Sequence, residues 1–260
     1  MRNKRADRNG LTLSLGLALL GLMLLPPAML GEERNPVVMP PHSVVAGKTL
    51  QEWSALWWKW AYAIPATDNP LLDDNGDKSK FGDVGPVFFL AGWFFQPPQP
   101  TVHRSVTIPA DKFIFFPIVN AVVDNVGNGC TAPTTTPCPG RLTIDQLFTQ
   151  LAGFFSPNPA ALTATVDDKQ IPNLWEHRET APAFSYTFQI TDSLSEKSFG
   201  YAGPDAVGTV FPAVADGYYL MLRPLHPRHH TISFGDGHFL IIYNVAVTAA
   251  ESRQPAVLIP

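Results

Sequence analysis

Charged residues are scarce in this 260-residue sequence, at 15%, whereas hydrophobic residues make up 45%. A chain of this composition can bury a sizeable core, which excludes an intrinsically disordered protein. The 26 prolines exclude a helical bundle, because proline breaks helix interiors, and they favour short strands joined by turns. The length fits one large β-rich domain once the N-terminal segment is set aside.

Cysteine is nearly absent, and the two that occur, Cys130 and Cys138, bracket a Thr/Pro-rich loop. Their spacing differs from that of CxxC redox or zinc pairs. In an oxidising compartment they are expected to form one disulfide, which would stabilise the fold by ~2–3 kcal/mol if unstrained.

The N-terminus is basic over its first ten residues and then apolar, which is the pattern of a signal peptide over residues 1–31. A membrane anchor is the alternative, although the apolar run from Leu11 to Leu25 is shorter than the ~20 residues of a typical span. We therefore expect an exported protein, periplasmic or extracellular, that touches a membrane only through this segment if it is uncleaved. Residues 32–48 are Pro-rich and are interpreted as a linker or an irregular leading strand, followed by a single domain over residues 49–260.

Positive charge is concentrated in the predicted signal segment. The whole chain has a net charge of −4, and residues 1–31 carry +3, so the remainder carries −7. This balance excludes nucleic acids and anionic membrane surfaces as expected partners.

A helix is predicted after Thr49, which forms a capping box with Glu52, and it should end at Pro65. One face of this helix carries apolar residues at helical spacing and is expected to cover a β-sheet core; these residues are Trp53, Leu56, Trp57, Trp60 and Ala61. Trp58 lies outside this face and is predicted to be exposed, which makes it a candidate binding residue. Trp93 is a second candidate for ligand stacking, although a buried strand explains it equally well.

Most of the remaining sequence alternates as strands do. The stretch AFSYTFQI places Phe184, Tyr186, Phe188 and Ile190 on one side, and Thr143 with Gln146 caps a second short helix. We predict a mainly β fold: an antiparallel two-sheet sandwich, jelly-roll or Ig-like, with one or two short helices packed on it.

Four of the seven histidines lie in HPRHHTISFGDGHF, residues 226–239, around a predicted two-residue turn at Asp236 and Gly237. That turn would pair Phe234 with Phe239, Ile232 with Ile241 and His230 with Tyr243. His229 and His230 would then point to opposite faces, and His229 and His238 would lie ~20 Å apart along the ladder.

These histidines are therefore not expected to share one metal ion. His230 is interpreted as a core histidine with a hydrogen-bonded ring. His226 and His229 remain metal candidates only if His42, His103 or His177 joins them. The stretch DDNGDKSKFGD lacks the spacing of an EF-hand loop. No metal or other cofactor is predicted.

Catalytic motifs such as GxSxG, HExxH, the P-loop and GxGxxG do not occur in the context that they need. The stretch EHRET offers Glu176, His177 and Glu179 as catalytic candidates, because a carboxylate beside histidine and arginine can serve as a general acid. A solvated loop is the alternative interpretation.

Several stretches together resemble a family of uncharacterised exported bacterial proteins. They are EWSALWWKWAYAIPATDNPLLD, GPVFFLAG, IPADKFIFFPIVNA, and DGYYLMLRPL followed by HHTISFGDG. The resemblance implies export and one compact β-rich domain, and it implies no activity. This chain departs from the family at Pro227-Arg228-His229, where the family has a glycine turn, so the resemblance implies no role for His229 and leaves His230 as the matching histidine.

Two classes of function follow. The first is an exported β-sandwich module with a binding or structural role in the cell envelope, its partner being a small molecule, a glycan or an envelope protein. The second is an exported hydrolase or lyase, with or without metal, whose site uses residues such as His177, Glu176, His226 and His229.

Overall fold

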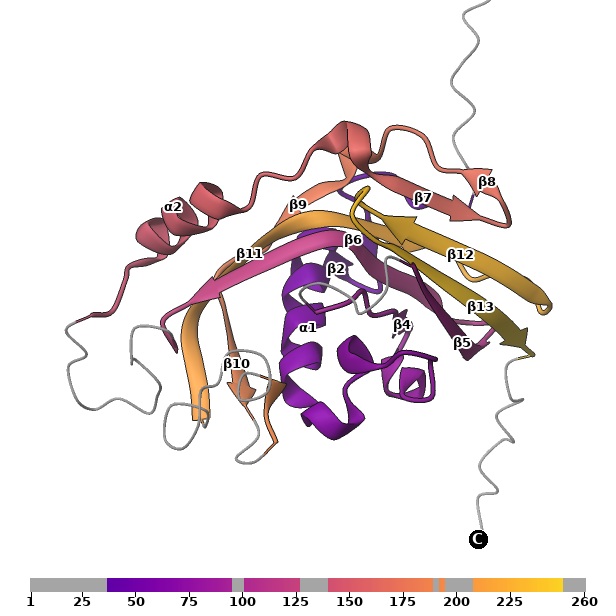
Figure 1. Cartoon of the computed structure of the whole chain (residues 1–260), viewed down its shortest axis with the longest axis horizontal. Helices are drawn as coiled ribbons and strands as arrows, with labels where there is room; N and C mark the ends of the chain where they lie inside the picture. Colours follow the sequence, from indigo (N-terminus) through magenta and orange to yellow (C-terminus); the bar gives the residue numbers. More distant parts are fainter. Residues whose placement is uncertain (1–36, 95–100, 127–139, 189–191, 195–207, 250–260) are drawn as a thin grey trace, which may run out of the picture. The chain divides into compact units, whose positions relative to one another are not determined.

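The structure, a computed structural model, describes residues 37–94, 101–126, 140–188, 192–194 and 208–249 (Figure 1). The chain divides into two units, residues 1–33 and 34–260, and all described residues belong to the second. The predicted signal segment and the pair Cys130 and Cys138 lie outside the described residues. No helix in the described ranges is long and apolar enough to cross a membrane.

Two sheets form a sandwich, which confirms the predicted mainly β fold (Figure 1). The first sheet has the order β10-β11-β6-β4-β3, with β9 also paired to β11. Its strands are β3 (Asp83–Val84), β4 (Val87–Phe89), β6 (Phe113–Asp124), β9 (Arg178–Thr180), β10 (Phe184–Phe188) and β11 (Gly208–Leu222). The second sheet has the order β5-β13-β12-β7-β8. Its strands are β5 (Thr101–Pro109), β7 (Thr163–Val166), β8 (Lys169–Gln170), β12 (His229–Gly235) and β13 (Leu240–Thr248).

The sheets are mixed, whereas the sequence predicted antiparallel sheets. Most neighbouring strands are antiparallel, but β4 pairs in parallel with β6, and β5 pairs in parallel with β13. Buried and exposed residues alternate in the same way along parallel and antiparallel strands. The sequence pattern therefore could not show whether neighbouring strands run parallel or antiparallel.

Three hydrophobic clusters fill the layers. Alternate residues of β11 point to opposite faces of the first sheet. Tyr219 and Met221 pack against α1 (Leu50–Ala63), whereas Leu220 and Leu222 pack against the second sheet. Farther along the same face as Leu220, Val214 packs against α2 (Ile144–Phe154). Thus α1 covers one face of the first sheet, and the second sheet and α2 share the other.

Both helices begin at the predicted capping boxes. Glu52 N donates to Thr49 Oγ1 at 3.2 Å and Thr49 N donates to Glu52 Oε2 at 2.8 Å, while Thr143 and Gln146 repeat the arrangement at α2. These reciprocal bonds satisfy backbone groups that have no partner within the helix. The first helix ends at Ala63, before Pro65, as predicted.

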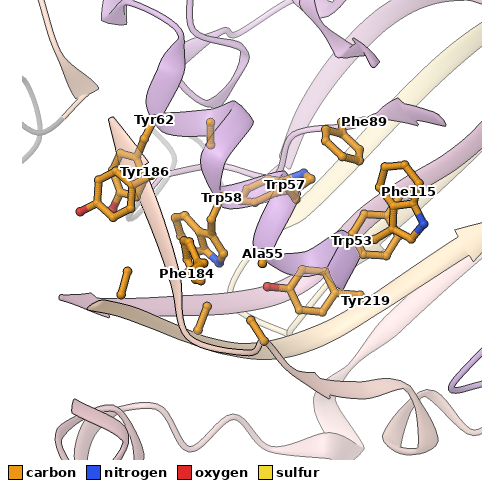
Figure 2. Packing of buried hydrophobic residues seen from close by; sticks show 14 of the residues in the cluster. Trp53, Ala55, Trp57, Trp58, Tyr62, Phe89, Phe115, Phe184, Tyr186 and Tyr219 are labelled. Carbon is orange, nitrogen blue, oxygen red and sulfur yellow. The ribbon is translucent and has the colours of Figure 1, made fainter. Parts of the chain in front are cut away.

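Trp58 is buried, at 3% exposure, and the prediction that it would be exposed is wrong. Its ring lies edge-on to Trp57, with centroids 5.1 Å apart, and stacks on Tyr62 at 5.6 Å; Tyr62 in turn stacks on Tyr186 of β10 (Figure 2). The helix contacts β9 and β10 as well as β11. More than one face of α1 is therefore buried, and a single helical stripe could not reveal this.

The hairpin of β12 and β13 has the predicted faces but a different register. Ile232 pairs with Tyr243 and Phe234 with Ile241, a shift of two residues from the predicted pairs. Only Gly237 of the turn has a positive φ, at 89°, so the turn is not the predicted two-residue type, which needs positive φ twice. A shift of two preserves the side-chain faces, because the period of a strand is two.

Part of the segment predicted as a linker or irregular leading strand packs on the domain. Val38 forms a bridge with Leu222, and β1 (Val44–Val45) pairs with β2 (Lys48–Thr49). Trp53 Nε1 donates to Val45 O at 2.9 Å, which fixes this small hairpin to α1. Residues 37–49 are thus attached both to the end of β11 and to α1.

Candidate functional site

A cleft with a volume of about 190 Å³ lies between residues 38–41 and residues 171–173; we call it the proline cleft. Pro40, Pro41 and Pro172 line its two walls. Glu176, His177 and Arg223 also line it, together with Asn173. Rigid apolar walls with a few convergent polar groups are typical of small-molecule sites, although most such sites are larger, at about 300–1,000 Å³.

Local backbone geometry brings Glu176 and His177 into this cleft. Asn173 has a left-handed φ of 54° and begins a short 3-10 turn, Leu174–His177, in which Glu176 N donates to Asn173 O at 2.9 Å. Asparagine tolerates this conformation better than most residues. The turn buries Leu174 and His177 and leads directly into β9.

The catalytic candidates from the sequence separate into two environments. Glu176 and His177 reach the proline cleft together, but Glu179 does not line it. Glu179 is fully buried on the face of β9 that packs toward α1, where its Oε1 accepts from His42 N at 3.3 Å. Burial raises the pKa of the Glu179 carboxyl, and the hydrogen bond from His42 and the nearby Gln51 side chain offset only part of this increase. The three residues therefore do not form one acid/base site.

The metal candidates lie on exposed surface. His226 and His229 are both exposed, and His229 borders a separate hollow with Asp77 and Lys80. Within the described ranges, no group of three or more His, Cys, Asp or Glu side chains is arranged to hold a metal ion. His42 is held by Glu179 and His177 lies in the proline cleft.

His230 is a core histidine with both ring nitrogens bonded. It is 6% exposed; Nδ1 lies 2.9 Å from Asp167 Oδ2, and Nε2 lies 2.9 Å from the His226 carbonyl. Burial raises the pKa of the Asp167 carboxyl, but hydrogen bonds from His230, Thr231 and Arg228 outweigh it, so that pKa is lowered. Because a carbonyl only accepts, Nε2 must donate, and this His–Asp pair cannot act as a general base.

Trp93 contacts the buried cation of Arg104. The centre of the Arg104 guanidinium lies 5.5 Å from the Trp93 ring centroid and 5.6 Å from that of Tyr243. Trp93 is half-buried and packs against the core between the sheets. The structure therefore gives Trp93 a structural contact, and neither tryptophan predicted to bind a ligand lies in the proline cleft.

Sequence reasoning missed two residues near the cleft. Arg223 follows the last residue of β11 and lines the cleft, where its Nη1 lies 2.7 Å from Met39 Sδ. Trp175 is 61% exposed on the same 3-10 turn as Glu176. Such an exposed tryptophan is unusual. Arg223 lies in the stretch LRPL and Trp175 in the stretch LWEH, both close in sequence to residues that were considered. The sequence does not show that these two stretches and residues 38–41 surround the same cleft.

Comparison with protein-family models, curated proteins and solved structures finds no match to this chain. The predicted resemblance to exported bacterial proteins therefore stays a prediction, and function must be argued from the geometry.

Proposed function

We propose that this protein is an exported β-sandwich module that binds a ligand in the proline cleft, in the periplasm or at the cell surface, without transforming it. The cleft is lined by three kinds of polar residue, Glu176, His177 and Arg223, beside apolar walls, and Arg223 Nη1 also contacts Met39 Sδ. Its volume of about 190 Å³ suits a small polar molecule or a single side chain of a partner protein.

The separation of the reactive groups carries this proposal. Glu179 faces α1, His226 and His229 are exposed elsewhere, and both nitrogens of His230 are occupied. A two-carboxylate or metal-assisted reaction needs such groups within a few ångströms of one reacting atom. Among the predicted catalytic and metal candidates, the described residues bring only Glu176 and His177 into one cleft, and these two support the alternative, a hydrolase or lyase.

A ligand screen by saturation-transfer NMR tests the proposal. Mixtures of amino acids, monosaccharides and dicarboxylates would be added to the full mature protein, to Arg223→Met and to Glu176→Gln. Because hydrogen bonds to charged groups contribute about 1.5–3 kcal/mol, a ligand of the cleft should bind each variant about tenfold or more weakly. The control His103→Met alters an exposed position on the second sheet and should bind like the wild type.

Two outcomes would contradict the binding role. If every ligand that binds the wild type also binds both variants unchanged, the cleft is not the site. If the NMR spectra show conversion of a ligand that stops in Glu176→Gln, the protein is an enzyme. Metal analysis of the purified protein complements the screen, since stoichiometric metal lost in His226→Ala or His229→Ala would also favour the enzyme.

Export itself is tested by the mature N-terminus. Mass spectrometry of protein from a fractionated host should find it outside the cytoplasm, with the first 31 residues removed if the segment is a signal peptide. A mass lower by two hydrogens than that of the reduced protein would show the predicted disulfide between Cys130 and Cys138.

A further inference from the structure

One wall of the proline cleft is attached to the domain at two places. At its start, Met39 N donates to Met221 O and Arg223 N donates to Val37 O, both at 2.8 Å. At its end, His42 N donates to Glu179 Oε1 at 3.3 Å, and His42 Nδ1 lies 3.4 Å from the same oxygen. The first attachment consists of these backbone hydrogen bonds and a contact between Arg223 Nη1 and Met39 Sδ at 2.7 Å, whereas the second depends on an ionisable carboxyl.

The Glu179 carboxyl is buried where His42 of this wall meets β9, which also contacts α1 and β11. It is 0% exposed, whereas the His42 side chain that contacts it is 69% exposed. Glu179 Oε2 is buried and accepts no hydrogen bond within the described ranges. Burying a charged carboxylate away from water costs free energy. Ionisation of Glu179 therefore favours a movement that lets water reach the carboxyl group.

Few charges compensate Glu179 from the surrounding elements. His42 faces it from the wall, uncharged Gln51 from α1, and Tyr219 interacts with it from β11. His177 precedes it by two residues in the sequence and is also buried. The neighbouring ion pair of Arg178 and Asp216 lies on the opposite face of the sheet, because side chains alternate along β9.

We propose that Glu179 is a pH-sensitive latch for residues 38–43: the uncharged carboxyl keeps this wall of the proline cleft closed, and the carboxylate releases it. His42 is the element that moves, because its backbone N–H and its exposed ring are the atoms of the wall that touch Glu179. The backbone at His42 is already left-handed, with a φ of 59°, a conformation that non-glycine residues adopt only when neighbouring contacts hold them. Control of ligand access by this latch rests on the proposed function of the cleft. The movement of the wall with pH does not depend on that function.

The sign of the pH effect follows from burial. The pKa of Glu179 is raised while the wall is closed, and it should return toward the ordinary value once water reaches the carboxyl. The closed wall is therefore fully favoured below the ordinary glutamate pKa of about 4.3, and this contribution is lost as the pH rises through the raised value.

Amide hydrogen exchange of the full chain without ligand tests the latch. Protection factors at His42 and Ser43, corrected for the chemical exchange rate at each pH, would be measured between pH 4 and 8. They should fall with rising pH, by about tenfold for each unit by which the pKa is raised. Glu179→Gln is uncharged throughout and should give a flat profile. Glu176→Gln, a matched change inside the same cleft, should keep the wild-type slope.

The wild-type series decides by itself if Glu179→Gln does not fold. A flat wild-type profile overturns the latch, and so does a slope that persists in a folded Glu179→Gln protein. Because no ligand is present, either result leaves the proposed binding role untouched. Conversely, failure of the ligand screen would leave the exchange profile unchanged.

Discussion

Replacing Arg104 with methionine should lower the free energy of unfolding by about 3 kcal/mol, because Arg104 organises buried carbonyls rather than an ion pair. The side chain is 1% exposed and lies between the sheets. Nε donates to Asp73 O, and Nη1 lies 2.8 Å from the Ala91 and Gly92 carbonyls and from the Tyr243 hydroxyl. Within the described ranges no carboxylate forms an ion pair with it.

The magnitude follows from which acceptors lose their donor. The Ala91 carbonyl also accepts from the Tyr243 hydroxyl at 2.8 Å, so methionine leaves chiefly the Asp73 and Gly92 carbonyls unpaired. Each unpaired buried group costs about 1–3 kcal/mol, or about 2–6 kcal/mol together. Loss of the contacts with Trp93 and Tyr243 adds about 1 kcal/mol. Removal of a desolvated charge returns part of this sum, which leaves a net loss near the lower end.

Urea denaturation followed by tryptophan fluorescence measures the effect. His103→Met, on the exposed face of the same strand, should stay within about 0.5 kcal/mol of the wild type. Arg104→Lys should be no more stable than Arg104→Met, because lysine keeps the buried charge without the planar fork of donors. If Arg104→Met is as stable as the wild type or more stable, desolvation of the guanidinium outweighs its hydrogen bonds and the reasoning is refuted.

Two further changes test other parts of the fold. Gly76→Ala should destabilise the protein by about 2 kcal/mol or more, because φ is +97° there and a Cβ would lie 2.2 Å from Ser105 O. Gly47→Ala, at φ +78° with no atom within 4 Å, should cost only about 1 kcal/mol in the same melt. Asp167→Asn should remove part of the acid sensitivity of folding. The pKa of Asp167 is lowered in the folded protein, so the carboxylate stabilises the wild type at pH values above the ordinary aspartate pKa of about 3.9. This stabilisation is lost as the pH falls through the lowered pKa. Urea melts between pH 2 and 6 would show it, and an unchanged acid slope in Asp167→Asn would contradict the role of the His230 contact.

Local patterns predicted local structure well. The capping pairs at Thr49 and Thr143 fixed both helix starts, and alternation placed Phe234 and Ile232 on the buried face of β12. These features depend on residues close in sequence, whose spacing determines the outcome. The register of the same hairpin was wrong by two residues, because Asp236-Gly237 is compatible with more than one loop length.

Features that depend on distant contacts were harder to predict. Trp58 was predicted to be exposed because the apolar periodicity of a helix identifies one buried face. It does not show whether other elements also cover the remaining faces. The proline cleft joins residues 38–41 to residues 171–177 and to Arg223, and no short stretch contains that arrangement. Glu176 and His177 were identified as site candidates from the chemistry of their side chains alone. That Glu179 lies outside the cleft could be known only from the packing of β9 against α1.

The position of β13 has a consequence for how the chain reaches its native state. This strand is among the last described residues, yet it lies inside the second sheet, between β5 and β12, and its parallel partner β5 was synthesised well over a hundred residues earlier. Until residue 248 is available, β5 has no neighbour in that sheet, and such long-range pairing forms slowly. The second sheet therefore cannot close before β13 has been synthesised, and β5 stays an unpaired edge strand while the intervening residues are made.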